Sequence, residues 1–310
     1  MRPARSVQIR DTIGCVKGGG MDAERGTQTV LITGATDGLG KAAALLLAEN
    51  GFRVFAAGRS AEKRAQLDTL ANEKKLSLET LGMDVCDDGS VQRAVNLVYQ
   101  KAGTIDVLIN NAGLAYVATV EDMTMEDWRR QFETNFFGVV RVTQAVLPKM
   151  RERRSGRIIM ISSVSGLVTP PTQGAYSASK HAMEGLSNAL RHELYPFEVK
   201  TILIEPGYIV TNIQQTAVQL VQPYQEKIQN GPYAKVYAGS WSGAKSSRRK
   251  SKTTPEDCAR VILKAIRASV PQARYGVTPL AATLKWAKRL LPDSAIDAMI
   301  RRRYGIMREG

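Results

Sequence analysis

The chain is poor in the residues that build metal sites and disulfide scaffolds. Its 310 residues include only three cysteines, Cys15, Cys86 and Cys258, and two histidines. The cysteines are far apart and form no C-x-x-C pair, so neither a structural zinc site nor a disulfide framework is expected. We therefore predict that the protein holds no metal and works in a reducing compartment.

Long hydrophobic runs are also absent. No stretch approaches the roughly 20 apolar residues that a membrane-spanning helix requires. The first five residues carry two arginines, but Asp11, Lys17 and the glycines at 18–20 interrupt any apolar segment that could complete a secretory signal. We therefore expect a cytoplasmic protein in which residues 1–26 form a poorly ordered N-terminal extension.

Acidic residues are scarce towards the C-terminal end. Residues 241–310 contain 16 lysines and arginines against five aspartates and glutamates, and the whole chain carries a net charge of +14. Such an excess raises the question of nucleic acid or an anionic membrane as a partner. The basic residues lack interleaved aromatic side chains and any recognised nucleic-acid-binding motif, so we expect no nucleic-acid partner.

Residues 280–310 are predicted to form a basic helical tail. Leu280, Leu284, Ala287 and Leu291 recur at helical spacing along one face, while cations such as Lys285 gather on another. An apolar stripe with flanking cations is typical of helices that make peripheral contact with an anionic membrane. The alternative, which the shortness of the stripe favours, is a helix that packs on its own domain or on a partner subunit.

Short apolar runs alternate with longer helical segments from residue 28 onward. Near-continuous hydrophobicity over a few residues is typical of strands that are buried on both faces. Such runs span residues 30–32, 54–57, 76–81, 107–109, 157–161 and 201–204, and helical segments are expected at 41–50, 60–75, 90–102 and 124–151. This alternation predicts an α/β fold with a single Rossmann-type, doubly wound parallel sheet flanked by helices.

No composition break divides residues 27–310, so we expect them to form one domain. Residues 213–252 mix Gln, Tyr, Gly, Ser and Lys around weak helical patterns. A connection of this length is usually a functional lid or disorder, and we interpret it as a C-terminal substrate lid. A new helix is predicted to begin at Thr254, because Pro255 and the two acids that follow it are helix-start signals.

A glycine-rich loop follows the first predicted strand and leads directly into a helix. Glycines allow the backbone to approach a pyrophosphate closely, and the free amides at the helix N-terminus bind its charge. The spacing of Gly38, Gly40 and Ala43 also fits the looser dinucleotide pattern G-x-G-x-x-A. The predicted nucleotide-binding residues of this loop are Gly34, Thr36, Asp37, Gly38, Leu39 and Gly40.

The end of the second predicted strand bears on the choice of cofactor. An acidic residue there would bind a free ribose 2′-hydroxyl, whereas an arginine favours a 2′-phosphate. The strand ends in Gly58 and is followed at once by Arg59. We therefore predict NADP rather than NAD, with Asp37 in the glycine loop adding a mild repulsion.

Taken together, the motifs closely resemble the short-chain dehydrogenase/reductase family. The resemblance covers about residues 27–270. It rests on the glycine loop, Asp84-Val85, Asn110-Asn111-Ala112-Gly113, Asn135, Ser162-Ser163, Tyr176-Ser177-Ala178-Ser179-Lys180 and Pro206-Gly207, which stand in this order along the chain. It implies that residues 27–310 form an NAD(P)-binding catalytic domain, and that the protein is an oligomer of identical subunits.

Tyr176 and Lys180 are four residues apart on a predicted helix, so their side chains share one face. An ammonium group near a phenol favours the phenolate and lowers the pKa of the tyrosine, which can then act as an acid or base near neutral pH. The resemblance assigns this proton transfer to Tyr176. It also assigns to Lys180 hydrogen bonds to the nicotinamide ribose.

The resemblance implies roles for further residues. Ser163 would bind the substrate oxygen, and Asn135 would hold a water that links Lys180 to solvent as a proton relay. Without the resemblance, Asn135 would be a partnered amide in the core. The remaining cofactor contacts that it implies are Asp84, Val85, Asn111, Ala112, Gly113, Pro206, Gly207, Ile209 and Thr211.

Residues 204–213 and 284–293 resemble the branch that contains retinol and hydroxysteroid dehydrogenases and related bacterial aldehyde reductases. This suggests an NADP-dependent enzyme that moves a hydride to or from a bulky apolar alcohol or carbonyl compound, such as a retinoid, steroid or aliphatic aldehyde. The alternative is a non-catalytic NADP-binding scaffold or redox sensor. The presence of all four catalytic positions favours the enzyme.

Overall fold

The protein is built around a central parallel sheet. The computed structural model describes residues 27–209 and 213–306. In this part of the chain the sheet has seven strands in the order β3-β2-β1-β4-β5-β6-β7, and every pair of neighbours is parallel. The strands are β1 (Thr29–Ile32), β2 (Arg53–Gly58), β3 (Leu78–Gly82), β4 (Val107–Asn110), β5 (Gly156–Ile161), β6 (Val199–Glu205) and β7 (Arg274–Gly276).

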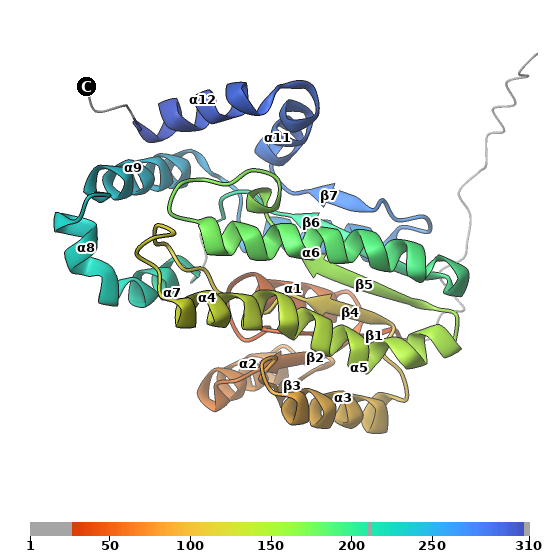
Figure 1. Ribbon diagram of the computed structural model, residues 1–310. Helices are drawn as coiled ribbons and strands as arrows, with labels where there is room; N and C mark the ends of the chain where they lie inside the picture. Colours follow the sequence, from red (N-terminus) through yellow and green to blue (C-terminus); the bar gives the residue numbers. More distant parts are fainter. Residues whose placement is uncertain (1–26, 210–212, 307–310) are drawn as a thin grey trace, which may run out of the picture.

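Helices cover both faces of the sheet, as Figure 1 shows. On one face, α1 (Gly38–Glu49), α2 (Ala61–Glu73) and α10 (Pro255–Arg267) pack over side chains such as Val30 and Ile109. On the other face, α3 (Asp88–Ala102), α5 (Gly138–Glu152) and α6 (Gly174–Glu193) pack over Leu31 and Leu108. Alternate residues of each strand thus enter two separate cores, which explains why the strands are apolar throughout. The predicted fold class is confirmed.

Strand β7 was not predicted. It has only three residues and lies at the edge of the sheet, where it pairs with β6 through Leu203, Ile204 and Glu205. Its sequence, Arg-Tyr-Gly, has no apolar run that could mark a strand, although Tyr275 enters the core. The helix predicted to begin at Thr254 is confirmed, and a capping box joins Thr254 to Asp257.

The helix predicted over residues 124–151 is interrupted in the structure. It consists of α4 (Met125–Phe132), a π-helical turn (Glu133–Phe137) and α5. In the π-helical turn the Gly138 N–H donates to the Glu133 carbonyl, five residues earlier. The extra residue changes the direction of the side chains without ending the helix, and such turns occur often at functional sites.

The segment predicted to be a lid is helical. It contains α7 (Ile213–Leu220), α8 (Gln225–Asn230) and α9 (Ala234–Lys250), and further short 3₁₀ turns lie at Val164–Gly166, Tyr195–Phe197 and Gln222–Tyr224. A third apolar cluster joins these helices to the loop after β4. Two tyrosines anchor it: the Tyr224 hydroxyl hydrogen-bonds Asp127, and the Tyr237 hydroxyl donates to Asp122 at 2.9 Å. The division of the chain into domain, lid and tail stays a prediction.

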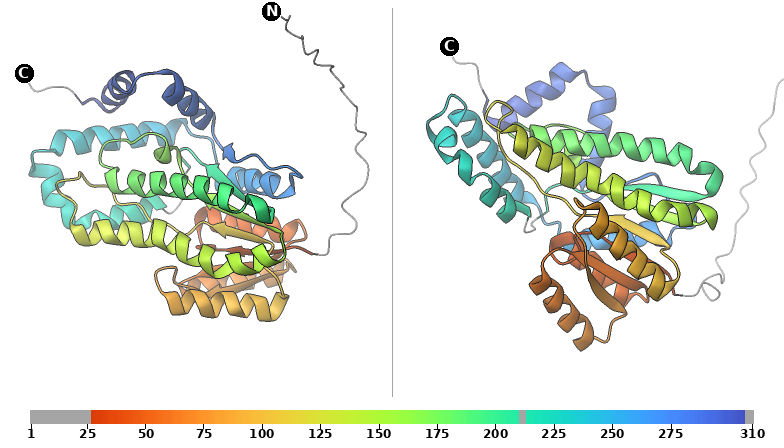
Figure 2. Two further views of the ribbon diagram at one scale, coloured as in Figure 1. Left: turned by 45° about the vertical axis from the view of Figure 1, so that its right-hand side comes forward. Right: turned by 60° about the horizontal axis from the view of Figure 1, so that its bottom comes forward.

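The basic tail forms two helices, α11 (Pro279–Leu290) and α12 (Asp293–Tyr304). They lie above α6 and α9 in Figure 1, and Figure 2 shows that α12 stays beside α9 as the molecule turns. Tyr304 is the contact: a Cβ on Gly243 would lie 2.5 Å from its ring, and one on Gly239 would lie 2.0 Å from its carbonyl oxygen. Among the described helices, none is long and apolar enough to cross a membrane.

Candidate active site

A cavity of about 1700 Å³ opens at the carboxyl ends of the strands. In doubly wound sheets ligands bind at this edge, where the strand order reverses, here between β1 and β4. The cavity is lined by Gly34, Thr36, Asp37, Gly38, Leu39, Gly40, Arg59, Asp84, Val85, Asn111, Ala112, Gly113, Ser163, Tyr176, Lys180, Pro206, Gly207 and Ile209. All these residues were predicted from the sequence. Thr211 lies outside the described residues, and Asn135 lies behind the wall.

The glycine loop packs so closely that side chains would not fit. Gly34 has a φ of +62°, and a Cβ on Gly40 would lie 2.3 Å from the Gly34 carbonyl oxygen. The Asn111 side chain donates to that same carbonyl at 3.0 Å, which ties the segment after β4 to the loop. The loop therefore presents backbone amides at the N-terminus of α1, and this cradle fits the pyrophosphate of a dinucleotide.

Asp37, which the sequence marked as a source of repulsion, is the N-cap of α1. Its carboxylate accepts from the Gly38 N–H at 2.7 Å and forms an ion pair with Lys63 at 2.5 Å. Lys63 lines the cavity with Arg59, which lies 3.9 Å from the Asp84 carboxylate. Sequence reasoning missed Lys63, which lies in the first turn of α2, because Arg59 precedes the N-cap Ser60 and no helical spacing relates the two residues. Arg59 and Lys63 thus place two cations at the end of the cavity beside the glycine loop.

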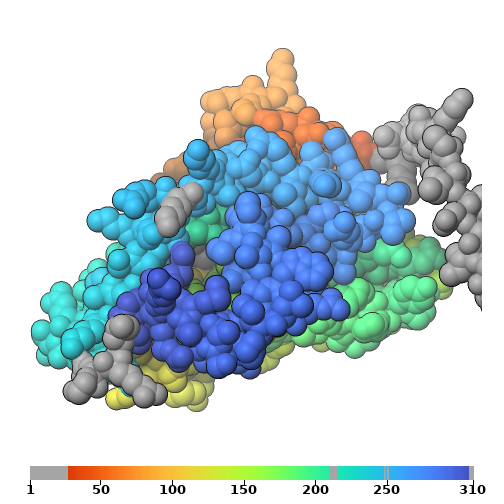
Figure 3. Space-filling view, turned by 90° about the horizontal axis from the view of Figure 1, so that it is seen from above, coloured from red at the N-terminus to blue at the C-terminus, as the bar shows by residue number. Residues whose placement is uncertain are grey.

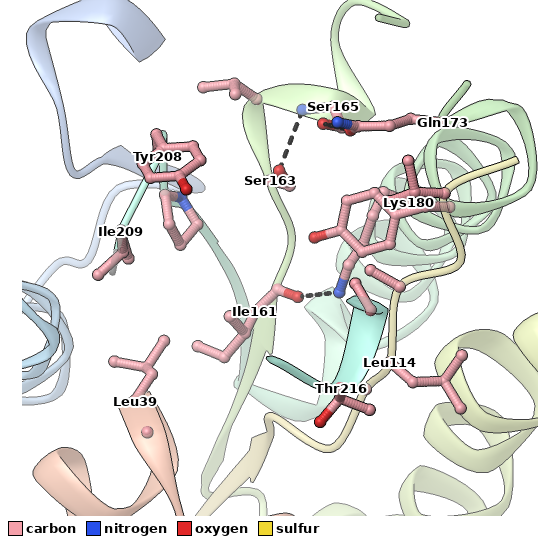
Figure 4. A pocket seen from close by; sticks show the side chains of 18 of the residues that line it. Leu39, Leu114, Ile161, Ser163, Ser165, Gln173, Lys180, Tyr208, Ile209 and Thr216 are labelled. Atoms are coloured by element: carbon pink, nitrogen blue, oxygen red, sulfur yellow. Dashed lines mark hydrogen bonds between the residues drawn. The ribbon is translucent and has the colours of Figure 1, made fainter. Parts of the chain in front are cut away.

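Tyr176 and Lys180 share one face of α6, as their spacing predicted. The Lys180 side chain is 5% exposed, and its Nζ donates to the Ile161 carbonyl at 2.7 Å (Figure 4). Its Nζ lies 5.7 Å from the centre of the Tyr176 ring. Burial lowers the pKa of Lys180 to about 8, while the Glu184 carboxylate acts in the opposite direction.

The expected depression of the Tyr176 pKa is wrong for the protein alone. Burial raises the pKa of the phenol, and hydrogen bonding with Ser163 only partly opposes this effect. The reason is that the free-energy cost of removing a phenolate from water exceeds the stabilisation that the neighbouring groups give to the phenolate. Tyr176 therefore keeps its proton at neutral pH and is suited to donating it.

Ser163 lies directly after β5 and begins a 3₁₀ turn. Its hydroxyl accepts from the Ser165 N–H at 3.1 Å, and Figure 4 shows this bond on the cavity wall above Lys180. The hydroxyl can still donate to a substrate oxygen, because its proton is not used in that bond. Leu114, Gln173, Tyr208 and Thr216 also line the part of the cavity that Figure 4 shows.

Asn135 sits in the π-helical turn and is fully buried. Its Oδ1 accepts from the Leu114 N–H at 2.9 Å, and its Nδ2 donates to the Leu114 carbonyl at 3.0 Å and to Ser179 Oγ at 3.3 Å. The side chain thus links the loop after β4 to α6. This is the partnered core amide that the sequence offered as the alternative, and the proton-relay role stays a prediction.

A buried charged network behind the catalytic edge was not predicted. Glu184 accepts from Ser162 Oγ at 2.5 Å and pairs with Arg274 of β7, which also donates to Glu205 of β6 at 2.7 Å. Glu184 and Glu205 are 7% and 2% exposed. Burial raises the pKa of Glu184, and Arg274 lowers it. The network fixes Ser162, the neighbour of Ser163, and lies one helical turn from Lys180.

Comparison with known proteins agrees with this arrangement. The sequence profile of the family described as short chain dehydrogenase matches residues 28–221. The 3-ketodihydrosphingosine reductase of Bacteroides thetaiotaomicron is 36% identical over 282 residues, or 90% of this chain and 98% of that protein. Retinol dehydrogenase 8 of Bos taurus is 34% identical over 252 residues, or 80% of each chain.

Solved structures are similar over most of the chain. A short-chain dehydrogenase from Streptomyces avermitilis has a TM-score of 0.72 and 28% identity, covering 89% of this chain and 96% of that one. An actinorhodin polyketide ketoreductase with NADPH has a TM-score of 0.69 and 28% identity, covering 82% and 95%. A Burkholderia phymatum protein with NAD is similar in fold alone, with a TM-score of 0.73 and 24% identity, covering 88% and 95%. The ketoreductase structure thus contains NADPH and the Burkholderia phymatum structure contains NAD.

Proposed function

The chain belongs to the short-chain dehydrogenase/reductase family of oxidoreductases, with retinol dehydrogenase-like relatives, and from this premise we propose an NADP-dependent enzyme acting on apolar compounds. It transfers a hydride between NADP(H) and the alcohol or carbonyl carbon of a bulky substrate such as a retinoid, a steroid or an aliphatic aldehyde. The observation that carries this proposal is that Ser163, Tyr176 and Lys180 meet the glycine loop in one cavity.

The side chains supply the proton and hold the reacting oxygen. When bound, NADPH would supply the hydride. Tyr176, which keeps its proton, donates it to the substrate oxygen, and the Ser163 hydroxyl binds the same oxygen as charge develops there. Lys180, held by the Ile161 carbonyl, provides positive charge beside the phenol and would bind the nicotinamide ribose. Asn135 orients the α6 residues through Ser179.

The choice of NADP is supported by the cations at one end of the cavity. Arg59 and Lys63 both line it, and β2 ends without a carboxylate. A 2′-phosphate would form charge-assisted hydrogen bonds with these groups. Lys63 also offsets the charge of Asp37, which the sequence alone left as an objection to NADP. We regard NAD as the weaker cofactor.

The substrate class is supported by the size and lining of the cavity. Beyond Ser163 the cavity continues between α9, α11 and α12, where Trp241, Leu284 and Met299 line it. Apolar walls of this extent fit a large hydrophobic molecule. Two relatives are named as a retinol dehydrogenase and a 3-ketodihydrosphingosine reductase, and both names refer to compounds with a long hydrocarbon portion.

The test is Tyr176→Phe, assayed by NADPH oxidation and NADP reduction with retinoids, steroids and aliphatic aldehydes or alcohols. We expect turnover to be abolished and NADPH affinity, followed by its fluorescence, to be nearly unchanged, because only the donated proton is removed. Tyr195→Phe is the matched control, since Tyr195 is exposed and far from the cavity lining. Substantial turnover by the Tyr176 variant would reject the assignment.

A non-catalytic NADP-binding scaffold or redox sensor is the alternative. It predicts that the unaltered protein binds NADPH but turns over no member of the panel. The intact set of Asn135, Ser163, Tyr176 and Lys180 favours the enzyme. We further propose that the protein is a cytoplasmic homo-oligomer, and that its tail touches anionic membrane surfaces peripherally.

A further inference from the structure

The C-terminal tail builds one wall of the cavity beyond Ser163. Leu280, Leu284 and Ala287 of α11 line it, together with Ile296 and Ile300 of α12. The stripe that the sequence offered for membrane contact therefore faces the cavity, apart from Leu291, which is outside the lining. This region is apolar, so it can hold the hydrocarbon part of a substrate.

Two arginines lie at the border of this apolar region. Arg302 and Arg303 line the cavity and remain exposed at its mouth. Arg303 donates to the Ser247 hydroxyl of α9 at 2.7 Å, and Ser247 lines the cavity as well. Neither arginine forms an ion pair with an acidic side chain in the described part of the chain. Their charge is therefore available to a ligand.

The acidic residues of the cavity lining are confined to the end beside the glycine loop. The acidic side chains that line the cavity are Asp37 and Asp84, and both lie beside the cofactor loop. The tail end holds positive charge alone, next to apolar walls. A ligand with a long apolar body and an anionic end would match this order of surfaces, because its charge could pair with a guanidinium while the body stays out of water.

The position of α12 follows from a close contact rather than from loose docking. Tyr304 lies against Gly239 and Gly243 of α9, where no larger residue would fit. Figure 3 shows α11 and α12 in blue across this face of the molecule, with the cyan helix α9 beside them. Residues 302 and 303 directly precede Tyr304, so the same contact holds them at the cavity.

We infer that the substrate carries an anionic group, a carboxylate or phosphate ester, at the end remote from its reacting carbonyl, and that Arg302 and Arg303 bind this group. The inference rests on the proposed function for the identity of the reacting group. It narrows the substrate class from apolar carbonyl compounds in general to amphipathic ones. Lys285 and Arg289, which lie outside the cavity lining, have no part in it.

The kinetic test compares ω-oxo fatty acids of increasing chain length with their methyl esters, at concentrations below micelle formation. For the unaltered protein we expect a lower KM for the acid at one or more lengths. In Arg302→Gln/Arg303→Gln the KM for that acid should rise about tenfold to a hundredfold, the range for hydrogen bonds to a charged group, with the ester unchanged. High salt should reduce the preference. Arg301→Gln is the control, because Arg301 is on the same helix but outside the lining.

A binding arm separates this inference from the proposed function. A saturated fatty acid and the corresponding alcohol, which have no reactive carbonyl, are titrated into the protein by calorimetry in the presence of NADPH. Tighter binding of the acid, lost in the double arginine variant and kept in Arg301→Gln, supports the inference even if no aldehyde is reduced. Equal binding of acid and alcohol, or equal loss of acid and ester turnover in the variant, would overturn it. Turnover without any preference for the acid over the ester would contradict this inference and still support the proposed function.

Discussion

Glu184 is the charged residue closest in sequence to the catalytic pair on α6, and its carboxylate raises the pKa of Lys180 against the effect of burial. Two carboxylates, Glu184 and Glu205, share one guanidinium, Arg274, so the ionised network has a net charge of −1. Buried charges interact over several ångströms because water does not screen them. The network therefore helps Lys180 to stay protonated.

For Glu184→Gln we expect the alkaline limb of the pH profile of kcat/KM to move to lower pH. The amide keeps a hydrogen-bond acceptor for Ser162 but removes the charge, so the pKa of Lys180 falls further below its present value of about 8. Lys180 then loses its proton at a lower pH. The measurement is the pH dependence of carbonyl reduction with saturating NADPH.

Glu193→Gln is the control for this experiment, because Glu193 is exposed at the end of the same helix and its change removes the same charge. An alkaline limb that stays fixed in Glu184→Gln, with activity lowered equally at every pH, would mean that the network only supports the fold.

Arg59 and Lys63 give a second prediction at this scale. Arg59→Leu should weaken NADPH binding by roughly 1.5–3 kcal/mol, the range for hydrogen bonds to charged groups, with much less effect on NADH. The same change at Lys63 should act in the same direction. The measurement is the dissociation constant of each cofactor by fluorescence titration.

Arg93→Leu is a matched control for Arg59→Leu. Arg93 is also an exposed arginine at 3.9 Å from an aspartate, Asp87, but it does not line the cavity. Equal losses for NADPH and NADH in the Arg59 variant would show that Arg59 supports the fold or the adenine instead of the phosphate.

At the level of elements, the π-helical turn marks a limit of sequence reasoning. Phe132, Phe136 and Phe137 suggested one continuous helix, and the position of Asn135 among them carried no sign of an extra residue in the turn. The turn is stabilised by the Asn135 bonds to Leu114 and Ser179, which are 21 and 44 residues away. Contacts of that range cannot be read from local periodicity.

The tail helix α11 has a second face that bears on membrane contact. Lys285, Trp286, Arg289 and Leu290 lie together on the side away from the cavity, and Trp286 and Leu290 are 59% and 73% exposed. Tryptophan and leucine flanked by cations are typical of helices at an anionic lipid surface. The structure thus moves the candidate membrane face from the original stripe to these four residues.

We expect the protein to co-sediment with vesicles that contain anionic lipid, and to bind neutral vesicles little. Lys285→Glu/Arg289→Glu should abolish sedimentation, because each cation near the surface contributes about 1 kcal/mol. Point variants are better suited than a deletion after Ala273, which would also remove β7 and Arg274. The control is Lys75→Glu/Lys264→Glu, with the same change of charge at exposed sites outside the tail. Protein that stays in the supernatant at low salt would exclude the membrane contact.

For the whole molecule, the sequence predicted the parallel sheet and most of the cofactor edge but not the distant walls. The strands and the glycine loop are local patterns, and the spacing of Tyr176 and Lys180 is fixed by the helix that carries them. The cavity walls formed by α9, α11 and α12 depend instead on how segments 60 or more residues apart pack, as Tyr304 does on Gly243. The pairing of Arg274 with Glu184 is of the same kind.

Cofactor binding should stabilise the whole molecule, because the cavity wall includes both the loop after β1 and the lid. At an NADPH concentration of about 100 times its dissociation constant, linkage gives roughly 2.7 kcal/mol. We expect the thermal unfolding midpoint to rise by several degrees, and by less with the same concentration of NADH. Differential scanning fluorimetry measures this without turnover. An unchanged midpoint with both cofactors would contradict the nucleotide site.

The contact of Tyr304 with two glycines of α9 also bears on how the enzyme could diversify. The cofactor edge belongs to the sheet and the loops that follow its strands, whereas the wall beyond Ser163 belongs to the helices α9, α11 and α12. A larger residue at position 239 or 243 would displace α12 and reshape that wall without touching Tyr176 or Lys180. We therefore expect substrate range to evolve, or to be redesigned in the laboratory, by exchanges at this helix contact while the chemistry stays constant.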